Sequence, residues 1–206
     1  MDDGALFLAW RAGDRAAGGQ LIERHFDAIA RFFATKVGVA HQDDLVQRTF
    51  LAAVEGAAGF RGDGSFRAFL FGIARTLVFE QYRATARDAR NDPDFSASAL
   101  VDLAPGLVTA ADARAERRRL VAALQRIPLE AQVLIELYYW EDLSVEELAQ
   151  ALDVPPGTIK SRLFKARAQL REAAEALDRL EPGGPSAQHE LDAWVAQMAA
   201  RGRGEP

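Results

Sequence analysis

Apolar residues recur at intervals of three and four over long stretches of this chain of 206 residues. Such an interval places them on one face of a helix, and that face must be buried against another helix. One apolar stripe runs from Leu21 to Phe33, and a second runs from Leu45 to Val54 after a turn at residues 38–42. The pattern predicts an all-α fold in which the helices are packed against one another.

A long interruption of this periodicity separates two helical parts. Residues 5–86 are expected to form successive helices, the third of which begins at a Ser65 N-cap and continues to about Arg87. Residues 88–112 are rich in proline, glycine and polar side chains and sustain no apolar period, which is typical of a linker. We therefore expect a helical domain at residues 1–87, a flexible linker at 88–112, a second small helical domain at 113–178 and a short C-terminal helical extension at 179–206.

The second domain has the sequence pattern of a helix-turn-helix. Helices are expected over residues 113–127 and from Pro128 to about Trp140, with the proline in the first helical position. Ser144 and Glu147 form a capping box at the start of a helix that ends at Leu152. A turn at residues 153–157 leads into a long helix from Thr158 to about Leu180. This succession predicts a motif whose second helix can enter a DNA groove.

Positive charge is concentrated on that second helix, although the whole chain has a net charge of -5. Residues 154–171 include five basic side chains and no acidic one. A charged helix face is more often only solvated, but an unbalanced basic run beside a capped partner helix favours contacts with phosphates and base edges. The residues expected on the outer face and its flanks are Thr158, Lys160, Ser161, Arg162, Phe164, Lys165 and Arg167.

Other function classes lack the residues that they need. The chain has no cysteine, and its three histidines are too far apart for a helical metal motif, so we expect no metal and no cofactor. We recognise no nucleophile–base pair and no glycine-rich phosphate loop, which makes an enzyme the least favoured class. Two aspartates follow Met1 where a leader would be basic, and no apolar run could span a bilayer, so we expect a cytoplasmic protein without membrane insertion.

Two separated sets of motifs resemble one family. Ile127-Pro128, LSVEELA at residues 143–149 and GTIKSRL at 157–163, followed by Lys165-Ala166-Arg167, resemble region 4 of the extracytoplasmic-function sigma factors of the sigma-70 family. DDLVQRTF at residues 43–50 resembles region 2.2 of that family, and FRGDGSFRAFLFGIAR at 60–75 resembles regions 2.3 and 2.4. The resemblance covers about residues 6–172 apart from the linker, and two motif sets in the family's order are more specific than either set alone.

The resemblance implies that the first domain is a sigma region 2 bundle and the second a sigma region 4 helix-turn-helix. The implied partners are RNA polymerase core and promoter DNA, with an anti-sigma factor as a further candidate. Region 2.2 would dock on the clamp helices of the largest polymerase subunit. Regions 2.3 and 2.4 would melt and hold the downstream promoter element, while region 4 would contact the polymerase flap and read the upstream element.

The motif positions imply residues for the two surfaces of the first domain. The polymerase core-binding residues would be Asp43, Asp44, Leu45, Gln47, Thr49 and Phe50. The downstream-element residues would be Arg61, Ser65, Arg67, Arg75, Thr76, Tyr82 and Arg83. Their cations suit phosphates, and their planar groups suit unstacked bases. Core packing is the alternative role for Leu45 and Phe50, and stabilisation of a helix start by acidic side chains is the alternative for the two aspartates.

The chain departs from the family pattern at Phe69, Thr76 and Gln132, where tryptophan, asparagine and arginine are common. Thr76 bears most on promoter preference, because its shorter side chain lacks an amide. The apolar face around Trp194 in the C-terminal extension is expected either to pack on the domains or to bind a regulator. Two rival hypotheses are a helix-turn-helix regulator whose first domain is a sensor, and an interaction module that sequesters a protein partner without binding DNA.

Overall fold

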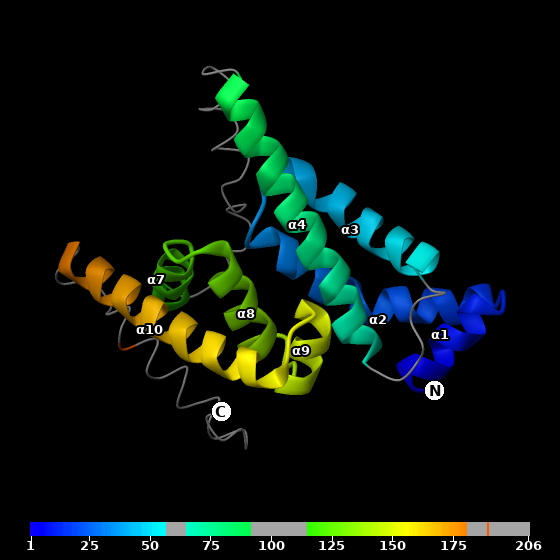
Figure 1. Cartoon of the computed structure of the whole chain (residues 1–206). Helices are drawn as coiled ribbons and strands as arrows, with labels where there is room; N and C mark the ends of the chain where they lie inside the picture. The colour runs from blue at the N-terminus through cyan, green and yellow to red at the C-terminus, as the bar shows by residue number, and fades with distance from the viewer. Residues whose placement is uncertain (57–64, 92–114, 181–188, 190–206) are drawn as a thin grey trace. The chain divides into compact units, whose positions relative to one another are not determined.

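The computed structural model describes residues 1–56, 65–91, 115–180 and 189. The regular elements in these ranges are α-helices, which confirms the all-α prediction (Figure 1). Contacts between residues divide the chain into two compact units, Met1–Leu107 with Gln150–Asp153, and Val108–Ala149 with Val154–Pro206. Most of the predicted linker and of the predicted C-terminal extension, with its Trp194 face, lies outside the described residues. Across the described ranges, no helix is both long enough and apolar enough to cross a membrane.

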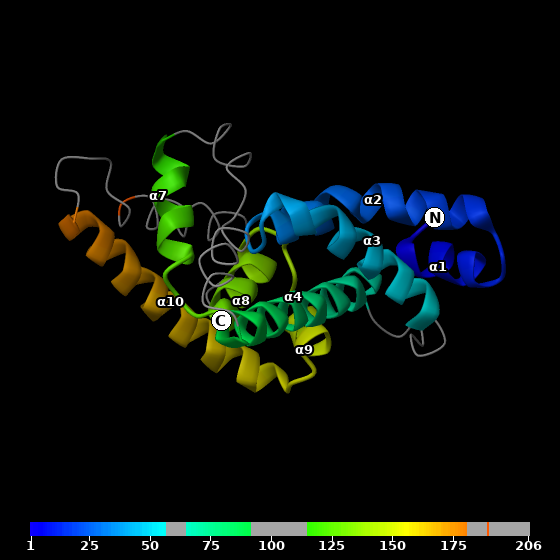
Figure 2. The same ribbon diagram turned by 90° about the horizontal axis from the view of Figure 1, so that it is seen from above.

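The first unit is built from α1 (Asp3–Arg11), α2 (Arg15–Ala34), α3 (Val39–Glu55) and α4 (Phe66–Asn91). The helix α4 packs on each of the other three, α1 also packs on α2, and α2 also packs on α3. Figure 2 shows α1 beside α2 and α3 beside α4. Fully buried aromatic side chains from three of these helices form the centre of the unit: Phe7, Phe32, Phe33 and Phe71.

Side-chain caps define where these helices begin. The carboxylate of Asp2 accepts a hydrogen bond of 2.8 Å from the backbone N–H of Ala5 at the start of α1. The hydroxyl oxygen of Ser65 accepts one of 3.2 Å from the backbone N–H of Ala68, which confirms Ser65 as the N-cap of α4. At its other end, α4 continues to Asn91, beyond the predicted end at about Arg87.

The second unit contains α7 (Ala115–Leu124), α8 (Leu129–Tyr139), α10 (Pro156–Leu180) and the greater part of α9 (Val145–Leu152). The helix α10 packs on both α7 and α8. Every residue of α8 from Ala131 to Tyr139 is buried, as expected for a helix that is apolar nearly all round.

Two helix starts in this unit differ from the sequence prediction, and both involve proline. Pro128 is the N-cap of α8 and not its first helical residue. The helix α10 begins at Pro156 and not at Thr158, so the predicted turn at residues 153–157 is shorter than expected. Proline suits a first helical position, because its φ is already helical and its missing N–H would have no partner there.

Candidate nucleic-acid interface

A complete capping box holds the start of α9, the first helix of the helix-turn-helix. The hydroxyl oxygen of Ser144 accepts a hydrogen bond of 3.1 Å from the backbone N–H of Glu147. The carboxylate of Glu147 accepts one of 2.8 Å from the backbone N–H of Ser144. Leu148 of α9 and Ile159 and Leu163 of α10 are fully buried, as expected for apolar residues on the inner faces of two packed helices. The capping box therefore stabilises the start of α9, the helix that leads into α10.

Asp153 shapes the turn between α9 and α10, with a positive φ of 52°. Left-handed backbone is uncommon outside glycine, and aspartate is among the residues that tolerate it. The backbone N–H of Thr158 then donates a hydrogen bond of 2.9 Å to the carbonyl oxygen of Pro155. This bond fixes the first turn of α10, and with it the position of Thr158 near the free N–H groups of the helix start.

The outer face of α10 presents the predicted DNA-contacting side chains. Lys160, Ser161, Arg162, Phe164 and Lys165 are exposed, and Thr158 and Arg167 are half-buried. In the part of the chain that the structure describes, no acidic side chain forms an ion pair with Lys160, Arg162 or Lys165. Three positive charges are thus available to an anionic partner such as a phosphate backbone.

Phe164 is an apolar exception on this basic face, with 73% of its surface exposed. It lies one helical turn after Lys160 and directly before Lys165. A large aromatic side chain in this position gains free energy only when a partner covers it. An apolar contact with a thymine methyl group in the major groove would do so.

The predicted downstream-element residues lie on different sides of α4. Thr76 and Arg83 are exposed and about two helical turns apart, so they share one side of the helix. Arg67 is half-buried and precedes Thr76 by about two and a half turns, which places it on the opposite side. The structure therefore brings Thr76 and Arg83 together but does not bring Arg67 to them. Arg61 lies outside the described residues.

Several of these side chains make polar contacts within α4, and the guanidinium Nε of Arg83 donates a hydrogen bond of 3.2 Å to the carbonyl oxygen of Phe79. The hydroxyl group of Thr76 donates a hydrogen bond of 3.0 Å to the carbonyl oxygen of Gly72. The guanidinium group of Arg75 lies 4.9 Å from the centre of the Phe79 ring, at a distance typical of a cation–π contact. The Phe79 ring therefore holds the guanidinium group of Arg75 close to the helix. At position 76, the family's common asparagine amide is replaced by a hydroxyl group that bonds to its own helix.

Tyr82 makes a hydrogen bond inside its own unit. It is half-buried, and its hydroxyl group donates a hydrogen bond of 2.8 Å to the backbone carbonyl oxygen of Lys36, just beyond the end of α2. The polar end of this side chain thus faces its own unit and not solvent. Like Ser65, Arg67 and Arg75, Tyr82 is half-buried, and its contact with the downstream element stays a prediction.

The predicted core-binding residues of α3 separate into exposed and buried groups. Asp43, Asp44 and Gln47 are exposed, whereas Leu45, Thr49 and Phe50 are buried. The hydroxyl group of Thr49 also donates a hydrogen bond of 2.7 Å to the carbonyl oxygen of Leu45. These three side chains pack inside their own unit, which agrees with the core-packing alternative for Leu45 and Phe50, and their part in core binding stays a prediction.

Sequence reasoning missed two exposed apolar residues of α3. Leu51 and Val54 are 56% and 44% exposed, although the sequence pattern predicts both in the buried stripe. They follow Asp44 and Gln47 at helical intervals of three and four, so the four side chains share one face. That spacing is the signal that could have found them. We call Asp43, Asp44, Gln47, Leu51 and Val54 the α3 surface.

Gln132 supports the second unit from inside. Its side chain is buried, and the amide group donates a hydrogen bond of 2.8 Å to the carbonyl oxygen of Ile127, in the loop between α7 and α8. The departure from arginine at this position thus places a neutral amide where a carbonyl group needs a donor.

Comparisons with known sequences identify both units. Residues 21–88 match the sequence model of the family Sigma-70 region 2, and residues 117–170 match that of Sigma-70, region 4. The chain is 32% identical over 172 residues to the RNA polymerase sigma factor NccH of Alcaligenes xylosoxydans xylosoxydans, covering 82% of this chain and 92% of that protein. It is 28% identical over 185 residues to the ECF RNA polymerase sigma-E factor of Haemophilus influenzae, covering 86% and 97%.

Solved structures show the same fold. CnrH, solved in complex with the cytosolic domain of CnrY, superposes with a TM-score of 0.62 at 26% identity, over 84% of this chain and 97% of that one. The sigma factor RpoE of Bartonella quintana, solved with the anti-sigma factor NepR, gives a TM-score of 0.62 at 22% identity, over 76% and 96%.

Proposed function

The chain belongs to the extracytoplasmic-function sigma factors of the sigma-70 family, and we propose that its two helical units divide promoter recognition between them. A sigma factor directs RNA polymerase core to promoters and is not an enzyme. In the proposed division, residues 1–87 bind core and open the downstream element, and residues 113–178 read the upstream element. Residues 88–112 form the connection between them, and residues 179–206 form an extension.

The observation that carries this proposal is the row of exposed cations without ion-pair partners on α10. Lys160, Arg162 and Lys165 have no acidic partner among the described residues, and they follow the helix start at Pro156. Free backbone N–H groups at that start suit one phosphate, and the cations suit phosphates and base edges farther along the groove. We propose that Thr158 and Ser161 add hydrogen bonds there, that Phe164 adds an apolar contact and that Arg167 flanks the site.

For the downstream element, we propose that α4 contributes its exposed side, with Thr76, Arg83 and the cation of Arg75. Ser65 and Arg67 at the start of the helix form a second group of contacts, and Arg61 is proposed from its motif alone. Opening requires no hydrolysis, because binding energy for the single strand can offset unstacking, which costs on the order of a few kcal/mol per base.

For the polymerase, we propose the α3 surface as the docking site on the clamp helices. It combines two carboxylates and an amide with two exposed apolar side chains, which suits a partner with basic and apolar residues. An anti-sigma factor is a further proposed partner, since a protein that covered this surface would prevent docking. We place this activity in the cytoplasm, where the polymerase works, and assign contact with the flap to residues 113–178.

Run-off transcription with purified core polymerase tests the proposed function. A panel of promoter templates should give transcripts of defined length when the chain is added, and none with core alone. A chain that bound promoter DNA but failed to associate with core would be a helix-turn-helix regulator, and that outcome would overturn the proposal. Association with core without any promoter-directed transcript would indicate an interaction module.

A further inference from the structure

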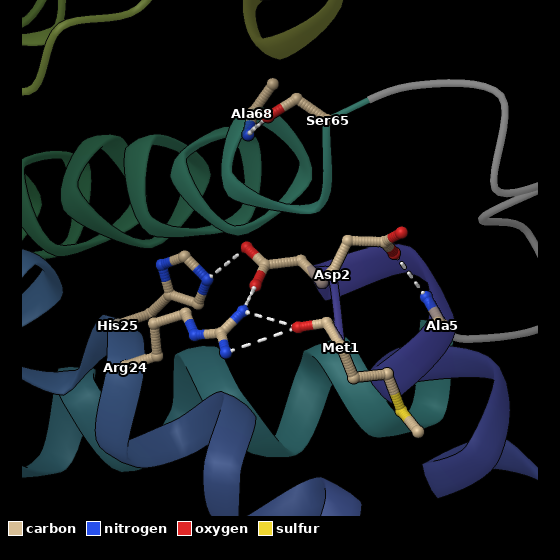
Figure 3. Close-up of polar contacts among 8 residues, drawn as sticks. Met1, Asp2, Ala5, Arg24, His25, Ser65 and Ala68 are labelled. Carbon is tan, nitrogen blue, oxygen red and sulfur yellow. Dashed lines mark hydrogen bonds and ion pairs between the residues drawn. The ribbon is translucent and has the colours of Figure 1, made fainter.

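Two residues of the first unit form a polar contact that the proposed promoter contacts do not explain. The ring Nε2 of His25, on α2, lies 2.6 Å from the carboxylate of Asp3 at the start of α1. The guanidinium group of Arg24 forms an ion pair with the same carboxylate and lies 3.5 Å from the backbone carbonyl oxygen of Met1. Figure 3 shows His25 and Arg24 reaching toward the start of the chain.

The ring of His25 is also in contact with the first residue of α4. Its centre lies 5.6 Å from the centre of the Phe66 ring, and Phe66 is almost completely buried. Phe7 of α1 packs on the same ring, with 5.0 Å between the two centres, and reaches Phe69 at 6.3 Å. The first turn of α4 is therefore held by side chains from both α1 and α2.

The hydrogen bond to Asp3 fixes the orientation of the histidine ring. A carboxylate only accepts hydrogen bonds, so the proton of a neutral His25 must lie on Nε2. Rotation of the ring would leave a buried N–H group without an acceptor, which is unfavourable. The ring face that meets Phe66 is thus set by a residue at the start of another helix.

Phe66 lies between two residues that we propose as downstream-element contacts. Ser65 caps the helix and Arg67 follows Phe66 directly, so any rotation of the first turn of α4 would move both. These two side chains are half-buried, so their orientation depends on how this turn is packed. The aromatic contacts of Phe66 determine that packing.

We propose that Asp3 and His25 are positioning residues for promoter opening, because their hydrogen-bonded contact fixes the first turn of α4 and so the direction in which Ser65 and Arg67 meet DNA. This inference rests on the proposed function of α4. It assigns to α1 a part in opening the promoter that is separate from docking on the polymerase, since the α3 surface lies on another helix.

The test compares variants of the full chain, each assembled with core polymerase into holoenzyme. His25→Phe keeps an aromatic ring against Phe66 but loses the bond to Asp3, and His25→Gln keeps a donor for Asp3 but loses the ring. Arg24→Gln is the matched control: it removes the neighbouring ion pair to the same carboxylate, and Arg24 forms no hydrogen bond or ion pair with α4 among the described residues.

Two quantities are measured for each variant: the affinity for core, and the fraction of bound promoter that is open, from permanganate reactivity of unpaired thymines. Both His25 variants should keep the core affinity of the wild type, and the ratio of open to closed promoter should fall about tenfold, the factor expected for one lost contact of this kind. The defect should shrink on a template whose downstream element is already unpaired. Arg24→Gln should open the promoter like the wild type.

Normal opening by both His25 variants would overturn the inference while leaving the proposed function intact. A parallel loss of core affinity and of promoter opening would also overturn it, since it would show a purely structural role. If a His25 variant fails to fold, the measurement is repeated with Asp3→Asn, which keeps the shape of Asp3. If the wild-type holoenzyme itself opened no promoter, the proposed function would fail instead.

Discussion

The hydroxyl group of Tyr82 donates a hydrogen bond of 2.8 Å to the backbone carbonyl oxygen of Lys36, which joins the middle of α4 to the residues that follow α2. The side chain of Lys36 is fully buried beside it, with its ammonium group 2.9 Å from the carbonyl oxygen of Phe32 and 3.9 Å from the centre of the Phe32 ring. Tyr82 thus completes the hydrogen bonding at a buried helix end.

Replacement of this tyrosine by phenylalanine should destabilise the first unit. Tyr82→Phe removes the hydroxyl group and leaves the carbonyl oxygen of Lys36 without that donor, so the free energy of unfolding should fall by about 1 kcal/mol. Urea denaturation followed by circular dichroism measures the change. Unchanged stability would show that the bond contributes nothing. A loss of promoter opening larger than the loss of folded protein explains would indicate that the hydroxyl group contacts DNA.

Stability of the first unit should depend on pH through His25. Burial lowers the pKa of His25 below its ordinary value of 6.5, and this outweighs the hydrogen bond to Asp3, which raises it. As the pH falls, His25 therefore binds a proton at a higher pH in the unfolded chain than in the folded one. The stabilising contribution of neutral His25 is fully present above pH 6.5 and is lost as the pH falls through 6.5 toward the folded pKa.

Urea denaturation at a series of pH values checks this dependence. The wild type should lose stability as the pH falls from about 7 to about 5, and His25→Gln should show a flatter profile over that range. Burial raises the pKa of Asp3, but the hydrogen bonds from Arg24 and His25 outweigh it and hold the pKa below 3.8. Asp3 therefore adds a second loss of stability below that value, which Asp3→Asn should remove. A wild type that became more stable on acidification would contradict the predicted direction of the stability change for both His25 and Asp3.

Local features of the fold could be predicted from the sequence, and contacts between distant residues could not. The Ser65 cap and the Ser144–Glu147 box depend on residues three apart, so the sequence pattern contains all that they need. The contact between Asp3 and His25 joins two helices through residues that neither apolar stripe includes. Nothing in the local sequence pattern distinguishes these two residues from polar residues that are exposed.

The candidate site shows the same division. The exposed face of α10 could be predicted from its charge and from the position of the preceding turn, because both are properties of the local sequence. On α3, the family motif identified the helix but not which of its sides faces out, and Thr49 shows why: its hydroxyl group is satisfied by the carbonyl oxygen of Leu45, so a polar residue is fully buried. The internal contact of Tyr82 could not be predicted for a related reason, since its partner at Lys36 is remote in sequence.

Charge reversal at Asp44 should weaken docking on the polymerase. Asp44 is exposed on the α3 surface, so Asp44→Arg should lower the affinity for core about tenfold while leaving the binding of the isolated chain to upstream-element DNA unchanged. Asp44 also lies 3.7 Å from Arg48, whose other carboxylate neighbour is Glu80 at 3.6 Å. Glu80→Arg is therefore the matched control, because it removes the other partner of Arg48 from α4. Equal losses in the two variants would assign the effect to Arg48 and remove Asp44 from the docking surface.

Charge reversal at Lys160 should weaken promoter binding by the second unit. Lys160→Glu removes an unpaired cation from the proposed groove face, so promoter affinity should fall about tenfold or more and its dependence on salt should become less steep. Affinity for core should stay the same. Arg179→Glu is the control, since it reverses an exposed cation at the far end of the same helix, near Glu175. Similar losses in both variants would indicate a general effect of net charge and not a specific face.

Adjacent glycines of α2 should respond to alanine with opposite signs. A Cβ atom at Gly18 would lie 2.3 Å from Nε1 of Trp10, whereas a Cβ at Gly19 would meet nothing within 4 Å. Gly18→Ala must displace the indole ring from α2 and should lower the free energy of unfolding by about 1–3 kcal/mol. Gly19→Ala should raise it by about 0.5–1 kcal/mol, because alanine loses less backbone entropy in a helix. Urea denaturation of the two variants measures both changes, and a stabilised Gly18→Ala would show that Trp10 does not rest on the helix at that point.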